Sequence, residues 1–241
     1  MTPEHDFRTG VVSPVECIKE GWALIKDQYW LFFGITLVGF IIGGAVPIVL
    51  FGPMMCGIFI CLLQRQRNEP VEFGTLFKGF DYFVPGLIVA VIKLIPMIII
   101  IVPFYIIMMV VMMTTMKGGR PEDTFLVIFP LEIIFGLVVT IVSIAIEILF
   151  MFAFPLVVDR KMSGLDAAKL SIKAGKANLG GVFGLLLLNA LLGFVGLLCC
   201  IIGVYFYLPV SFAAMSVAYR RVFPQVPENF AQPPPPPASW A

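Results

Sequence analysis

The sequence predicts an all-α integral membrane protein with about six transmembrane helices, additional interfacial amphipathic helices and a parallel internal repeat. Of its 241 residues, 60% are hydrophobic and only 13% are charged, and several uncharged stretches are long enough to cross a bilayer. Soluble domains carry about 45–50% apolar and about 25% charged residues. Lipid, rather than water, is therefore the expected solvent for most of this surface.

Three parts are expected along the chain. Residues 1–12 are polar and form a loose N-terminus, and residues 13–223 form the membrane domain. Residues 224–241 contain five consecutive prolines and predict a disordered or polyproline II tail.

The first element is an amphipathic helix with Ser13 as N-cap, Pro14 at the first helical position and Glu16 three residues after the cap. It is too charged to span lipid, and its apolar stripe predicts an interfacial position: Val15, Ile18, Trp22, Ile25 and Tyr29. The uncharged run that follows is nearly two spans long. We place these spans at about 30–46 and 47–64.

A second interfacial helix is predicted over 73–81 from the spacing of Phe73, Leu76, Phe77 and Phe80. Spans three and four, at 82–116 and 124–155, form a central long hairpin over 82–155. Both are longer than a bilayer requires, so the hairpin should tilt or protrude on the far side. A third amphipathic helix starts at Ser163, and spans five and six follow at 179–198 and 199–219.

The basic residues predict that both termini lie in the cytoplasm. With six spans, thirteen Lys and Arg residues flank one side, whereas the other side holds only Lys117 and Arg120. The sixteenth basic residue, Lys93, lies within span three. Cytoplasmic loops carry the excess of positive charge, and a five-span arrangement would divide this cluster.

A shift of 150 residues overlays the two capped helices and predicts repeat units at about 13–67 and 163–221. An even number of crossings separates the units, so the repeat would be parallel. Two unrelated hairpins that start in the cytoplasm would also resemble each other. The matched pairs, the last two after a gap of six residues, are Ser13 with Ser163, Lys19 with Lys169, Lys26 with Lys176, Pro53 with Pro209 and Arg65 with Arg221.

Pro53 and Pro209 each lie twelve residues before the closing arginine of their unit. A proline inside a helix removes one hydrogen bond and leaves a carbonyl that needs another partner in lipid. A neighbouring helix could satisfy that carbonyl. Alternatively, the two prolines mark broken helices around a central binding site.

Three ionisable residues are expected at membrane depth: Lys93, Glu132 and Glu147. Charges at this depth are costly and are often functional. Lys93 lies eleven residues after Tyr82 and Glu147 eight residues before Pro155, so both are expected near the cytoplasmic ends of antiparallel spans. We predict that Lys93 and Glu147 form an ion pair and could line a binding site, whereas Glu132 lies nearer the far side and reaches water.

No catalytic residue, metal site or cofactor is expected, because the chain lacks the common catalytic motifs and has a single histidine, His5. The five cysteines lie without disulfide or metal-site spacing and are expected to act as packing residues. Nucleic acid is not an expected partner, given a net charge of +1.

Two kinds of partner are expected. Lys169, Lys173 and Lys176 share one helical face and should lie against anionic lipid headgroups, or simply anchor the helix. The proline-rich tail could dock in an aromatic groove of a cytoplasmic protein, or be inert. The oligomeric state does not follow from the sequence.

Several segments together resemble a bacterial membrane protein family related to the membrane domain of some glycerophosphodiester phosphodiesterases. They are Trp22 before span one, Gly52-Pro53 with Gly57, residues 76–80, the 159–178 segment, and the closing Tyr219-Arg220-Arg221. The resemblance covers about 13–223 and implies a multi-pass protein of the inner membrane. In that family the hydrolase activity belongs to a separate soluble barrel, so no catalytic residue is carried over.

Two functional hypotheses follow. The first is a non-enzymatic scaffold or interaction protein that recruits a partner through its tail. The second is a small transporter or lipid-handling protein with a polar site near Lys93 and Glu147. A water-filled cavity at mid-depth would favour the second hypothesis, and a solid core the first.

Overall fold

The computed structural model describes residues 7–118, 121–198 and 202–224, with the side chains of 115–127 excepted. Within these ranges every regular element is a helix, which confirms the all-α class. The elements are α1 (Pro14–Ile25), η2 (Lys26–Gln28), α2 (Tyr29–Ala45), α3 (Phe51–Gln66), η3 (Phe73–Tyr82), α4 (Phe83–Gly118), α5 (Pro121–Phe150), α6 (Ala153–Asp159), α7 (Gly164–Ala177), α8 (Leu179–Leu198) and α9 (Gly203–Val222).

Four helical segments in the described residues are long and apolar enough to cross a membrane. They are Pro14–Ala45, Phe73–Thr114, Ile128–Asp159 and Leu179–Leu198. The predicted spans two and six correspond to α3 and α9, which are not among these four. Helix α3 has only 16 residues and is buried from Gly52 to Leu63, so protein rather than lipid surrounds it.

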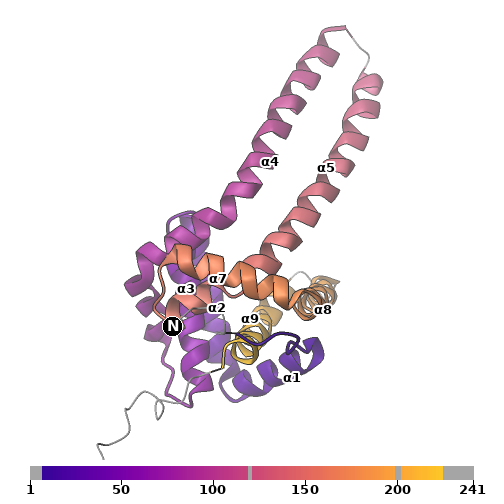
Figure 1. Ribbon diagram of the computed structural model, residues 1–241. Coiled ribbons are helices and arrows are strands. Elements are labelled where there is room, and N and C mark those ends of the chain that lie inside the picture. The colour runs from indigo at the N-terminus through magenta and orange to yellow at the C-terminus, as the bar shows by residue number, and fades with distance from the viewer. Residues whose placement is uncertain (1–6, 119–120, 199–201, 225–241) are drawn as a thin grey trace, which may run out of the picture.

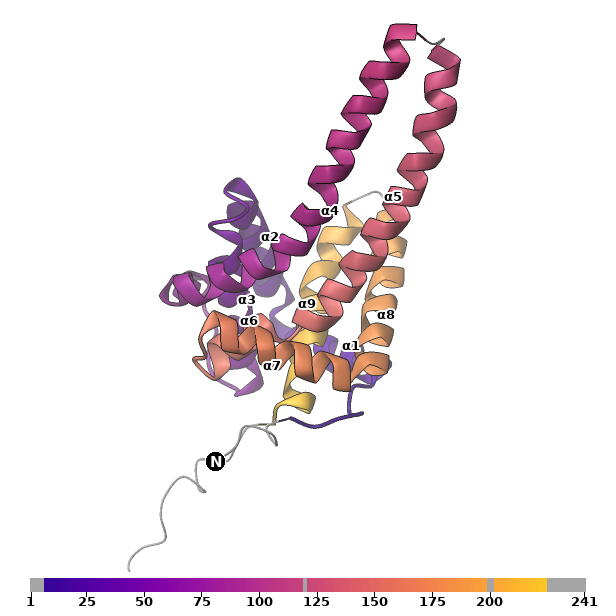
Figure 2. The ribbon, with the colours of Figure 1, turned by 45° about the horizontal axis from the view of Figure 1, so that its top comes forward.

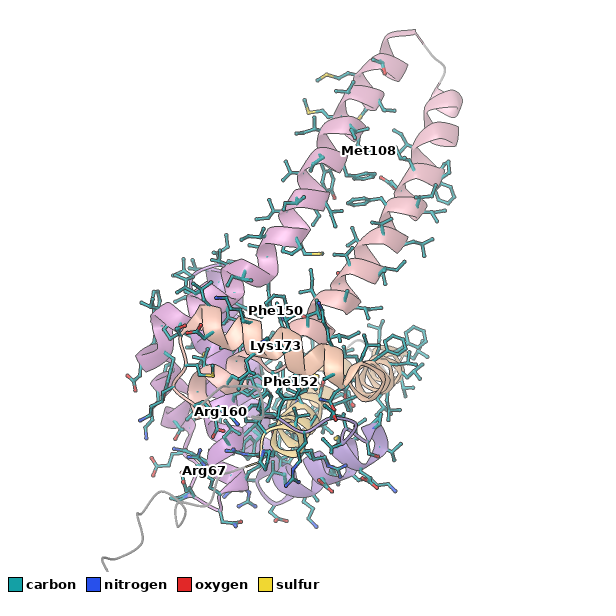
Figure 3. The ribbon with its side chains drawn as sticks, in the orientation of Figure 1. Arg67, Met108, Phe150, Phe152, Arg160 and Lys173 are labelled. Carbon is teal, nitrogen blue, oxygen red and sulfur yellow. The ribbon has the colours of Figure 1, made fainter. Side chains whose placement is uncertain are left out.

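Helices α4 and α5 form the predicted long hairpin, which protrudes well beyond the other helices (Figure 1). With 36 and 30 residues they are about 54 and about 45 Å long, against a hydrocarbon thickness of about 30 Å. Apolar side chains project on all sides of the hairpin, including around Met108 (Figure 3). Such a surface requires lipid or another apolar partner around it.

The helix predicted for span four is broken before its predicted end. Helix α5 stops at Phe150, and the chain turns before the separate short helix α6, which contains the buried Pro155. Proline has no N–H to donate to a preceding turn and is well tolerated in the first turn of a helix. Pro155 therefore belongs to the start of α6, where it marks a new helix rather than the end of a span.

Helix α7 crosses the base of the hairpin and contacts both of its helices (Figure 2). Its inner face consists of small buried residues, among them Gly164 and Gly175. A Cβ atom on Gly164 would lie 2.5 Å from the carbonyl oxygen of Pro85 in α4, and one on Gly175 equally close to that of Ile148 in α5. Only glycine permits these close approaches. Helix α7 therefore sets the distance between α4 and α5 at the base of the hairpin.

The N-caps of the two matched helices differ. Ser163 accepts a hydrogen bond from the Asp166 N–H, as the sequence predicted, and its hydroxyl donates to the Asp166 carboxylate at 2.7 Å. Ser13 also occupies the N-cap position, with Pro14 following it, but its side chain makes no capping hydrogen bond. The two units nevertheless share one element order: amphipathic helix, long apolar helix, and a helix containing a proline.

Each predicted apolar stripe has one fully buried member, Ile25 in α1 and Leu76 in η3, whereas several of its other large side chains are exposed. In α1 the buried residues are Cys17, Gly21 and Ile25, whereas Val15 and Trp22 are about half exposed. The 73–81 segment is a 3-10 helix that buries Thr75, Leu76 and Gly79 and leaves its three phenylalanines exposed. Apolar side chains can face lipid as readily as protein, so small residues mark the protein contacts instead.

Candidate functional site

The ion pair predicted between Lys93 and Glu147 is present. Lys93 Nζ, on α4, donates a hydrogen bond to Glu147 Oε1, on α5, across 2.8 Å. The Lys93 side chain is 17% exposed and the Glu147 side chain 48% exposed. The ammonium of Lys93 also lies 6.0 Å from the ring centre of Phe154. The pair therefore joins the two helices of the hairpin near its base.

A partly open cavity of about 360 Å³ adjoins this ion pair. Binding sites for small molecules typically enclose about 300–1,000 Å³. Apart from the ion pair and one hydroxyl, its wall is apolar. The lining residues are Pro47, Ile48, Phe51, Ala90, Lys93, Leu94, Met97, Ser143, Ile146 and Glu147.

Three parts of the chain build the cavity. Helices α4 and α5 form two walls, and the turn between α2 and α3, with the first residue of α3, forms the third. Directly after Phe51, α3 and α4 cross so closely that a Cβ atom on Gly52 would collide with the backbone of Gly86. The hydroxyl of Ser143 lies 3.8 Å from the sulfur of Met97, which links the two walls above the ion pair.

The ion pair lies farther from the basic cluster than its position in the predicted spans indicated. Phe51 lines the cavity at one end of α3, and Arg67 directly follows the other end. Sixteen helical residues separate these ends, a length of about 24 Å. Helix α6 adds length between Glu147 and the basic end of the molecule. The expectation that the pair lies near the cytoplasmic ends of its spans stays a prediction.

Glu132 does not belong to this site. It is exposed on α5, fifteen residues from Glu147, and it is absent from the cavity wall. Fifteen helical residues correspond to about 22 Å. No ion pair connects Glu132 with another residue whose side chain the structure describes.

Pro53 and Pro209 are buried, and neither lines the cavity. Pro53 lies in the first turn of α3, where backbone N–H groups have no partner within the helix, so it removes no helical hydrogen bond. Pro209 lies inside α9, where the neighbouring carbonyl of Phe206 accepts a hydrogen bond from the Tyr29 hydroxyl at 2.6 Å. The two prolines are thus not equivalent, and the structure does not bring them together with Lys93 and Glu147.

The predicted lysine row is exposed on α7, on the face opposite its small buried residues. Lys173 projects outward near the middle of the helix (Figure 3). Within the described part of the chain, Lys169, Lys173 and Lys176 form no ion pair with a carboxylate. The exposure of the row is compatible with both expected roles, and its contact with anionic headgroups stays a prediction.

Sequence reasoning missed a buried charge cluster centred on Asp159, at the end of α6. Both carboxylate oxygens of Asp159 accept hydrogen bonds from Arg220 at 2.8 Å, and Arg67 donates to Oδ1 at 2.6 Å. The Tyr219 hydroxyl donates to Oδ2 at 2.8 Å. Asp159 is only 10% exposed. The only signal in the sequence was one acid beside basic residues at a span end, which does not identify its partners.

These hydrogen bonds join three helices at one carboxylate. Arg67 directly follows α3, Asp159 ends α6, and Tyr219 and Arg220 belong to α9. Asp159 therefore ties α3, α6 and α9 together.

Cys17, Cys56 and Cys61 are buried free thiols, in agreement with their predicted packing role. Cys199, Cys200 and the proline-rich tail beyond residue 224 lie outside the described residues, as do residues 1–6, half of the predicted loose N-terminus.

Comparison with known proteins gives no relative from which a function could be transferred. No family model, curated protein or solved structure matches this chain. The resemblance to the membrane domain of glycerophosphodiester phosphodiesterases therefore stays a prediction, and the case for function depends on the cavity and its ion pair.

Proposed function

We propose that the chain is a multi-pass protein of the bacterial inner membrane, with six crossings and cytoplasmic termini, that binds a membrane lipid without transforming it. The observation that supports lipid binding is the cavity of about 360 Å³ beside Lys93 and Glu147. A cavity, rather than a solid core, is the feature that favours a lipid-handling protein over a scaffold.

The chemistry of the cavity fits an amphiphile. Its wall is mostly apolar, and its charges are concentrated in one ion pair. Apolar ligand groups gain by leaving water for such a wall, while buried charges require a partner. An acyl chain would lie against Ile48 and Ile146, with its polar end at Lys93 and Glu147.

A second candidate is an interaction protein that recruits a cytoplasmic partner through residues 225–241. Its support is the five-proline run in the tail and the position of Pro224 beside Arg220 and Arg221, at the basic end of the molecule. The two candidates are compatible in one protein, but they make different predictions for variants.

Filling the cavity tests the lipid proposal. Ala90 lines the cavity and is 9% exposed, whereas the next residue, Val91, is 38% exposed and does not line it. We expect A90F to lower the lipid co-purified per protein at least about fivefold, since its ring would occupy space that the ligand needs. Mass spectrometry of lipid extracted after detergent purification gives this ratio.

V91F is the matched control, because it adds the same ring at the neighbouring, outward-facing position. It should retain lipid like the unmodified protein, and so should a chain that lacks residues 225–241. Equal lipid retention by A90F and V91F, with both proteins monodisperse, would refute lipid binding in this cavity.

A further inference from the structure

The ion pair leaves part of its hydrogen-bonding capacity unused on the side of the cavity. A lysine ammonium has three N–H donors and a carboxylate has two acceptor oxygens. One donor of Lys93 is bound to Oε1 of Glu147. Among the described residues, no other hydrogen bond uses the remaining donors of Lys93 or the Oε2 atom of Glu147.

These unused groups carry opposite charges within one ion pair. A ligand with a single negative charge would gain from Lys93 but would be repelled by Glu147, which is the more exposed partner. A ligand that carries both an anion and a cation would satisfy both groups. Phospholipids with a phosphate and an ammonium in the same headgroup have this arrangement.

The wall of the cavity also distinguishes between two kinds of ammonium. Proteins recognise quaternary ammonium groups mainly with cages of several aromatic rings. Among the residues that the structure describes, Phe51 is the only aromatic one in this wall. A primary ammonium, in contrast, can donate N–H hydrogen bonds to a carboxylate, and such charge-assisted bonds are strong.

We propose that the cavity selects a zwitterionic phospholipid with a primary ammonium, namely one with an ethanolamine headgroup. Its phosphate accepts a hydrogen bond from Lys93, and its ammonium donates to Glu147. This inference rests on the proposed lipid binding and adds the class of headgroup.

The test uses the full chain in detergent, incubated with an equimolar mixture of three phospholipids that share acyl chains and differ only in headgroup. The headgroups are ethanolamine, choline and glycerol, and native mass spectrometry measures the bound fraction of each. We expect ethanolamine lipid to exceed glycerol lipid about tenfold, the effect of one charge-assisted hydrogen bond. It should exceed choline lipid by a smaller ratio of about threefold.

Variants show whether Glu147 is responsible for this preference. In E147Q the ratio of ethanolamine to glycerol lipid should fall to about one or below, because the carboxylate that attracts the ammonium and repels the anion is lost. E132Q removes a carboxylate from the same helix outside the cavity, so it should keep the original ratio. The double variant K93E/E147K retains both charges and should keep a preference for ethanolamine lipid.

The outcomes separate the two proposals. Equal binding of the three lipids by the unmodified chain, or an unchanged ratio in E147Q, would overturn the headgroup inference while leaving lipid binding intact. Absence of all three lipids would overturn the proposed function itself. The ratio for the unmodified chain is decisive alone, so the inference stays testable even where E147Q does not fold.

Discussion

Lys93 and Glu147 show how far single residues can be interpreted from a membrane protein sequence. Charges inside long apolar stretches are few, so two of opposite sign on consecutive antiparallel helices are natural partners. The sequence correctly predicted this pair, which is 2.8 Å apart. It could not predict the distance from the pair to the basic end of the molecule, because that depends on the break between α5 and α6.

At the residue scale, the pair predicts a specific pattern of stability. K93E would place two carboxylates together, and E147K two ammonium groups, so each single change should lower the free energy of unfolding by about 2 kcal/mol. For a chain of this size that corresponds to about 4–8 °C in apparent Tm. A thermal shift assay in detergent measures it.

The double variant K93E/E147K restores opposite charges and should recover at least half of the lost Tm. E132K, an exposed change on the same helix, is the matched control and should lower Tm by less than about 2 °C. If the double variant is as unstable as the sum of the single variants, the two residues do not interact in the folded protein.

At the scale of helices, the sequence located most elements but not the small residues through which they pack. Helix α8 has the predicted bounds of span five, and the central hairpin was predicted from its length. The apolar stripes of α1 and η3 did not identify the protein contacts, because an apolar side chain has two possible environments in a membrane, protein and lipid. Close packing in these helices depends on small residues such as Gly21 and Gly79, whose partners are distant in sequence.

Asp159 connects three helices, and its removal gives the second stability prediction. D159N leaves Arg220 without its opposite charge in a buried position, where its side chain is only 15% exposed. Loss of one member of a buried pair typically costs about 3–5 kcal/mol, so we expect apparent Tm to fall by about 6–20 °C. The matched control is D27N, because Asp27 pairs with Arg65 at 3.5 Å but is 66% exposed.

At the scale of the whole molecule, the two ends of the described chain lie together. The N–H of Arg8 donates to the carbonyl of Val222 at 2.8 Å, and the rings of Phe7 and Phe223 are 6.1 Å apart. Arg67 and Arg160 lie at this same end, opposite the tip of the α4–α5 hairpin (Figure 3). Arg8 and Val222 therefore lie on the same side of any membrane that the hairpin crosses.

This geometry and the positive-inside rule together predict the topology. A phosphatase that is active only outside the cytoplasm should be inactive when fused after Ala241 and active when inserted between Gly118 and Gly119. A fluorescent protein that matures only in the cytoplasm should give the reverse result at the same two positions. Because the contact between Arg8 and Val222 holds the ends together, a fusion before Met1 should match the fusion after Ala241. Phosphatase activity at one terminus but not at the other would require an odd number of crossings and would overturn the six-span arrangement.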